Sequence, residues 1–108
     1  MQISNQPYPF SLNAVTGGTS TVTTAGTRVQ LPTLTCKRAL IQSHETNGAK
    51  TNGGVIVVGG SNVVAASAGR NGYAIYPTQS QVFEVSNLNL LWVDSTDDGS
   101  LVTYITLN

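Results

Sequence analysis

His44 and Glu45 are the residues most suggestive of hydrolytic chemistry, because they lie side by side in a chain rich in serine. A histidine base beside a serine nucleophile would carry out acyl transfer. Such a site is defined by its geometry, and no strand-to-helix nucleophile elbow here would place a serine beside His44. We therefore interpret His44 as a solvated residue at a strand end, and we predict that the protein is not an enzyme.

Cys36 is the only cysteine, and His44 is the only histidine. A lone cysteine can form no internal disulfide, and these two residues supply no zinc site of the usual ligand spacing. Because Cys36 follows a turn and enters an apolar strand, we predict that it packs as a small buried hydrophobe.

The carboxylates gather at Asp94, Asp97 and Asp98, directly before Gly99. A helix-flanked calcium loop would need a bidentate glutamate at its twelfth position, which falls here on Ile105. Because Asp and Gly are also what a hairpin turn requires, we predict a solvated turn, with a weak surface cation site as the alternative.

Paired glycines flank the apolar run Val55–Val58, at Gly53-Gly54 and Gly59-Gly60. They match neither the dinucleotide-binding nor the P-loop pattern, and no helix start follows them. The sequence thus predicts no catalytic, cofactor-binding or metal-ligating residues, and no cofactor.

Charge is scarce throughout the chain. Only 9% of the 108 residues are charged, and five basic residues balance five acidic ones, whereas ordinary soluble domains have about 25% charged residues. Binding to nucleic acid depends on neutralising phosphates, so this balance argues against DNA or RNA as a partner. Apolar runs such as Val55–Val58 are far shorter than the roughly 20 residues that span a bilayer, and residues 1–10 lack the features of a signal peptide. We expect no membrane partner and no export signal.

The elements that would position these residues are strands. Val and Thr dominate while the helix formers Glu, Lys and Met are rare, and three Asn-Gly pairs and one Asp-Gly pair predict closely spaced reversals. We predict strands over Thr19–Thr24, Arg28–Leu31, Lys37–His44, Gly54–Val58, Asn62–Ala66, Tyr73–Tyr76, Gln81–Val85, Leu90–Asp94 and Leu101–Leu107. Short strands in this number are typical of a single antiparallel β-sandwich, here predicted to be jelly-roll-like.

Some segments carry a clearer signal than others. Alternation is clearest in Leu101–Leu107, where Val102, Tyr104 and Thr106 would share one face. Residues 36–43 fit both helical and strand spacing, and we choose a strand because no capping box precedes them. Residues 63–68 could also form a loop or one helical turn.

Residues 1–18 differ from the 19–108 sandwich domain and predict an extended N-terminal arm. Its Tyr8-Pro9-Phe10 run could lie across a sheet but could not join the middle of one, because proline withholds an N–H. Trp92 lies in a strand with apolar residues on both faces, so that strand is either sandwiched on both sides or meets a partner. We predict Tyr8, Pro9, Phe10 and Trp92 as subunit contacts.

Four blocks occur along the chain in the order Gly26–Pro32, Cys36–Arg38, Val57–Val63 and Phe83–Asn89, the last followed by Trp92. In these blocks the chain resembles a group of small structural proteins from tailed-bacteriophage virions. The resemblance covers about Gly26–Leu107, leaves the arm uncovered, and is interrupted by a longer insertion around Asn47–Gly54 where a loop-borne function stays open. Small β-sandwich proteins of tailed phages often act as capsid cement or decoration proteins, and the resemblance implies that role.

The predicted function is therefore a capsid cement protein that binds the major capsid protein on the virion surface, made in the host cytoplasm without a signal peptide. We expect it to form a symmetric homo-oligomer, as a trimer, because shell symmetry multiplies each contact. The alternative is a carbohydrate-binding or host-receptor-binding module of a head fibre or tail appendage, supported by the Thr- and Asn-rich surface and by Trp92 or Tyr76 as an aromatic platform.

Overall fold

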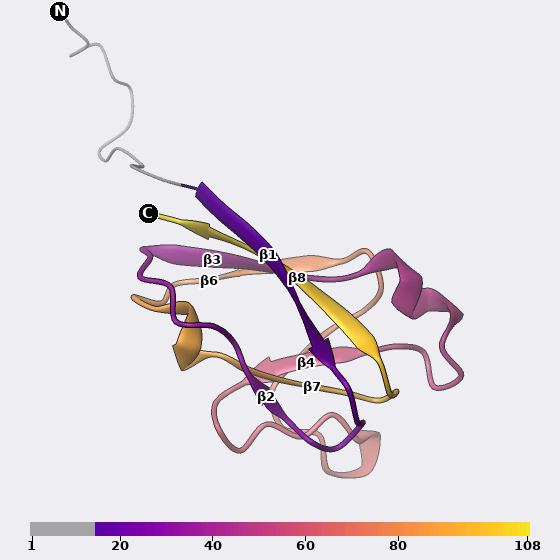
Figure 1. Cartoon of the computed structure of the whole chain (residues 1–108). Helices are drawn as coiled ribbons and strands as arrows, with labels where there is room; N and C mark the ends of the chain where they lie inside the picture. The colour runs from indigo at the N-terminus through magenta and orange to yellow at the C-terminus, as the bar shows by residue number, and fades with distance from the viewer. Residues whose placement is uncertain (1–14) are drawn as a thin grey trace, which may run out of the picture.

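The computed structural model describes residues 15–108, which form two four-stranded antiparallel sheets packed as a sandwich (Figure 1). One sheet has the strand order β1-β8-β3-β6, and the other has the order β2-β7-β4-β5. The strands are β1 (Val15–Val22), β2 (Val29–Gln30), β3 (Arg38–Ser43), β4 (Ile56–Gly59), β5 (Tyr73–Ile75), β6 (Ser80–Phe83), β7 (Trp92–Ser95) and β8 (Ser100–Leu107). The prediction of an all-β sandwich is confirmed.

The strands pair in a nested series. β1 pairs with β8, β2 with β7, β3 with β6, and β4 with β5, so that one long antiparallel ribbon is folded over on itself. Two further pairings, β3 with β8 and β4 with β7, join the folded ribbon into sheets. Among the described strands, only β4 and β5 are neighbours both in sequence and in a sheet. Most turns, including those at two of the three Asn-Gly pairs and at the Asp-Gly pair, therefore connect strands of different sheets and do not close tight hairpins.

The predicted strands differ most from the observed ones at β1 and at Asn62–Ala66, and the start of the predicted strand Leu90–Asp94 belongs to the 3-10 helix η4 (Leu88–Leu90). β1 begins at Val15, so residues 15–18, expected to belong to the arm, lie in the sheet. The predicted strand Asn62–Ala66 is wrong: this segment lies in the β4–β5 loop, whose only ladder contact is an isolated bridge between Val64 and Asn71. The short 3-10 helix η3 (Ser67–Gly69) follows, so the loop alternative holds for residues 63–66 and the helical turn begins only at Ser67.

The main core lies between the two sheets. In β8 every second residue is buried, so Val102, Tyr104 and Thr106 share one face as predicted, and that face is the inward one. They meet Ala39 and Ile41 of β3, which confirms the strand at that ambiguous segment. Burying such β-branched and aliphatic side chains supplies most of the free energy of folding, about 1.5–3 kcal/mol for each fully buried side chain.

A second, smaller cluster covers the outer face of the β2-β7-β4-β5 sheet. The β4–β5 loop places Val63 and Ala65 over Val57 of β4, and Trp92 of β7 packs half-buried against this group. The apolar strand around Trp92 is therefore sandwiched on both sides within the chain itself. The full burial of Val57 on the outer face of its sheet has the same cause.

Adjacent glycines in β1 face opposite sides of their sheet. A Cβ at Gly18 would overlap the ring of the inward-facing Tyr104, whereas a Cβ at the outward-facing Gly17 would find its nearest neighbour, the Tyr104 carbonyl oxygen, at 3.5 Å. We expect Gly18→Ala to lower the free energy of unfolding by about 1–3 kcal/mol through overpacking.

The matched control is Gly17→Ala, for which we expect a change within about 0.5 kcal/mol because the site is on the surface. Chemical denaturation followed by tryptophan fluorescence measures both variants. Equal destabilisation by the two substitutions would contradict this account of the β1–β8 packing.

Candidate functional site

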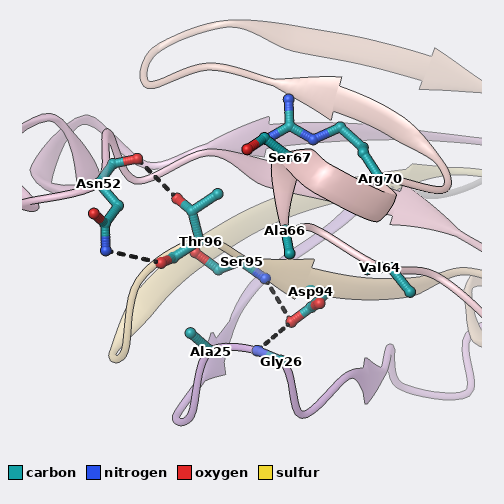
Figure 2. Close-up of a pocket in the computed structure, with 10 residues that line it drawn as sticks. All are labelled: Ala25, Gly26, Asn52, Val64, Ala66, Ser67, Arg70, Asp94, Ser95 and Thr96. Carbon is teal, nitrogen blue, oxygen red and sulfur yellow. Dashed lines mark hydrogen bonds between the residues drawn. The ribbon is translucent and has the colours of Figure 1, made fainter.

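A cleft of about 570 Å³ opens at one end of the sandwich (Figure 2). It lies between the β1–β2 loop, the β4–β5 loop and the end of β7, and is lined by Ala25, Gly26, Asn52, Val64, Ala66, Ser67, Arg70, Asp94, Ser95 and Thr96. A second hollow of about 430 Å³ adjoins it, sharing Ala25, Asn52 and Thr96 and adding Lys50, Asp97 and Asp98. Asp94, Asp97 and Asp98 thus line these two adjoining hollows.

Asp94 lies beneath the cleft and is only 2% exposed. Its Oδ1 accepts hydrogen bonds from the backbone N–H groups of Gly26, at 2.9 Å, and of Ser95, at 2.8 Å, as Figure 2 shows. Its Oδ2 accepts one from Ala65 N–H at 2.9 Å. One carboxylate therefore ties the β1–β2 loop and the β4–β5 loop to β7.

Asp97 has the same role toward the β3–β4 loop. Its Oδ1 accepts from Asn52 N–H at 2.9 Å, and its Oδ2 accepts from Gly54 N–H at 2.8 Å and from the Thr96 hydroxyl at 3.0 Å. Burial alone would raise the pKa of Asp97, but these hydrogen bonds and the positive charge of Lys50 outweigh it and lower the pKa. The carboxylate is held in its charged form.

The prediction of a solvated turn is therefore wrong for Asp94 and Asp97, which are buried, whereas Asp98 is exposed. Asp98 accepts from Ala25 N–H at 2.7 Å through Oδ1. The cation alternative gains no support, since residues 15–108 contain no group of three or more His, Cys, Asp or Glu placed to hold a metal ion. Both oxygens of Asp94 and Asp97 already accept hydrogen bonds from the protein.

His44 precedes the short 3-10 helix η2 (Glu45–Ala49) and caps it. Its Nδ1 accepts from Thr46 N–H at 3.1 Å and lies 2.9 Å from the Thr46 hydroxyl. This is a local structural contact and involves no serine. Cys36 is buried as predicted, with its thiol donating to the Val85 carbonyl at 3.3 Å, and burial raises the pKa of that thiol.

Asn47 is a structural residue that the sequence did not reveal. Its side chain is fully buried, donates to the Leu101 carbonyl at 2.8 Å and accepts from Leu101 N–H at 2.9 Å. Its Nδ2 also donates to the Ser43 hydroxyl at 3.0 Å. The Asn47-Gly48 pair suggested only a turn, although the amide joins the β3–β4 loop to β8. With Gly54 bonded to Asp97, this loop is fastened at both ends.

The polar groups that remain for a ligand in the cleft are Asn52, Ser67 and Arg70. The Arg70 Nε donates to the Ala65 carbonyl at 3.0 Å, which holds the guanidinium at the rim next to Ser67 (Figure 2). An amide, a hydroxyl and a guanidinium can bind a small polar molecule, but they supply neither a nucleophile with its base nor a metal. The cleft is therefore suited to binding a small polar molecule.

The outer face of the β1-β8-β3-β6 sheet is a second candidate surface. Gly17, Ile105, Leu40 and Val82 are register partners and form one row across all four strands. Val15 and Leu107 lie in the next outward row, beside Arg38. We call Val15, Leu40, Val82, Ile105 and Leu107 the apolar strip. Val15, Val82 and Ile105 are 63%, 43% and 39% exposed.

The sequence-predicted contacts are only partly placed by the structure. Tyr8, Pro9 and Phe10 lie outside the described residues. Trp92 packs against the chain's own loop, and its role as a subunit contact stays a prediction. Among residues 15–108 no helix is long and apolar enough to cross a membrane.

Comparison with known proteins adds no assignment. No family model matches the chain, and no curated protein or solved structure is significantly similar to it.

We expect Asp97→Asn to lower the free energy of unfolding by about 1–3 kcal/mol, because the new amide NH₂ would face a backbone N–H and leave a buried donor unsatisfied. Asp98→Asn is the matched control: it is exposed and uses only one oxygen, which asparagine retains. Urea denaturation at neutral pH measures both. If Asp98→Asn lowered the free energy of unfolding as much as Asp97→Asn, the structural role assigned to the Asp97 hydrogen bonds would be contradicted.

The same carboxylate predicts a pH dependence. Since the pKa of Asp97 is lower in the folded than in the unfolded state, its contribution is fully present above the unfolded value of about 3.9 and is lost as pH falls through the folded value. We expect the difference in stability between the wild type and Asp97→Asn to be constant near neutrality and to shrink below about pH 4. Thermal denaturation across this range, with Asp98→Asn in parallel, measures it. A difference that grows on acidification would contradict the assignment.

Proposed function

We propose that this protein is a structural component of a bacteriophage virion, a cement protein that binds the lattice of the major capsid protein as a homo-oligomer, expected as a trimer. The proposal rests on the family resemblance in sequence and on one observation of the structure. Large apolar side chains are exposed on a molecule with very little surface charge.

The exposed apolar residues are Val15, Tyr73, Tyr76, Val82, Leu90 and Ile105, each at least 39% exposed. The surface carries fewer charged side chains than the composition implies, because two of the five acidic residues, Asp94 and Asp97, are buried. Protein interfaces are depleted of charge at their cores and enriched in aromatic residues. A surface of this kind favours contact with other protein subunits over contact with charged ligands.

The connectivity also supports the proposal. A ribbon in which the first strand pairs with the last, the second with the seventh, the third with the sixth and the fourth with the fifth is the pattern of a jelly roll. We therefore propose the jelly-roll form of the sandwich, which is common in viral capsid proteins and in lectins. Because one fold serves several functions, the surface, and not the fold, carries the proposal.

The second candidate function is carbohydrate or receptor binding by a head fibre or tail appendage. The cleft at the loop end favours it, since Asn52, Ser67 and Arg70 could bind sugar hydroxyls. Trp92 supports it less than the sequence suggested, because its ring packs half-buried on the second cluster. Tyr76 is exposed but does not line the cleft.

Cryo-electron microscopy of the virion tests the first function. We expect density for this sandwich at regular positions on the capsid shell, in contact with the major capsid protein. Density only at the tail or on a fibre, or none on the shell, would contradict the cement function.

A glycan array separates the two candidates, and we expect no binding by the wild type. Arg70→Ala and Trp92→Ala identify the surface responsible if a glycan binds. Binding that is lost in Arg70→Ala would establish the carbohydrate function at the cleft and overturn the first proposal.

A further inference from the structure

We propose that the apolar strip receives the Tyr8-Pro9-Phe10 run of a second copy of this chain. The inference rests on the homo-oligomer of the proposed function and names the surface through which copies join. It assigns the strip to contact between copies and leaves the capsid contact to other surfaces.

The strip is well defined by the register of the sheet. Leu40, Val82 and Ile105 lie side by side on three adjacent strands, and Gly17 extends the row to the edge strand β1. The outward row on one side, Thr19, Thr103, Gln42 and Ser80, carries no charge, and the row on the other side contains Arg38 beside Leu107. With strands spaced about 4.8 Å apart, the row is about 14 Å long. That length suits a short extended segment carrying two aromatic rings.

Residues 1–14 match this surface chemically. They include Tyr8 and Phe10 and contain no Asp, Glu, Lys, Arg or His. Docking them on the strip would remove apolar area from water, and the segment brings no charged side chain of its own. Pro7 and Pro9 restrict the preceding residues to extended backbone, which reduces the entropy lost on binding.

The chain's course at Val15 favours a second copy over the same copy. β1 enters the sheet at Val15, opposite Leu107, and runs antiparallel to β8 (Figure 1). To cover its own strip, the preceding chain would have to turn back over the sheet within the four residues 11–14, directly before β1. Five residues of extended chain span at most about 17 Å, so an arm that continues away from Val15 could bring Phe10 to a neighbouring copy.

The size of the strip argues against simple face-to-face pairing of two sheets. A stable interface buries about 800 Å² on each partner, with some 20–30 residues a side. Five side chains on a flat face are too few, whereas two aromatic residues from an inserted segment would each bury about 150–250 Å². An exchange of segments also repeats around a closed ring, as an oligomer requires.

Disulfide trapping in the full-length protein tests the contact. Copies carrying Phe10→Cys are mixed with copies carrying Val82→Cys, oxidised mildly, and examined by non-reducing electrophoresis and peptide mass spectrometry. We expect a disulfide between positions 10 and 82 of different copies. The wild type is the blank, because its Cys36 is buried.

The matched control replaces Val82→Cys by Leu90→Cys, an exposed hydrophobe outside the strip. We expect at least a tenfold lower yield of cross-linked dimer with position 90. Equal yields at the two positions, or a disulfide formed only within one chain of a Phe10→Cys/Val82→Cys double variant, would overturn the inference.

Analytical ultracentrifugation gives a second readout that needs no cross-link. Val82→Thr with Ile105→Thr keeps β-branched residues in the sheet, and we expect it to raise the dissociation constant of the oligomer at least tenfold, with Leu90→Thr unchanged. If the dissociation constant of the Val82→Thr/Ile105→Thr double variant equals that of the wild type, the strip is not the contact between copies. Because the position on the capsid is measured separately, the inference can fail while the cement function stands.

Discussion

Two buried carboxylates hold the loop end of this sandwich together. Asp94 binds backbone N–H groups of the β1–β2 and β4–β5 loops, and Asp97 binds those of the β3–β4 loop. Loop N–H groups have no partner strand, and leaving them buried and unpaired would be costly. A carboxylate provides charge-assisted hydrogen bonds in several directions at once, which offsets the desolvation of its charge. These two side chains therefore fix the three loops around the cleft, including the β4–β5 loop that packs on the outer face of the β2-β7-β4-β5 sheet.

Much of the fold could be predicted from the sequence because it depends on local pattern. The alternation of Val102, Tyr104 and Thr106 follows directly from one face being buried. The segment Asn62–Ala66 misled for the same reason: Val63 and Ala65 are buried on one side like strand residues, but their backbone has no neighbouring strand. Side-chain alternation reports burial, and only pairing makes a strand.

The candidate site was harder to predict. Asp followed by Gly indicates a turn whether the carboxylate points to solvent or into the protein, because the backbone requirement is the same. What decides the outcome for Asp97 is the approach of Asn52 and Gly54 from a distant loop. For the same reason Asn47-Gly48 indicated a turn but not that the buried Asn47 side chain hydrogen-bonds to the backbone of Leu101. Roles that depend on contacts distant in sequence are not encoded in local motifs.

The pairing of β1 with β8 has a consequence for synthesis. All eight residues of β1 are paired with β8, from Val22 opposite Ser100 to Val15 opposite Leu107, so every pair joins residues far apart in sequence. During translation β1 therefore has no partner strand, and its backbone N–H and C=O groups stay exposed to water until β8 has left the ribosome. Such non-local topology slows folding and leaves strand edges open to association in the meantime. β1 is rich in Thr and Gly, so the unpaired strand exposes little apolar surface to other chains before β8 is made.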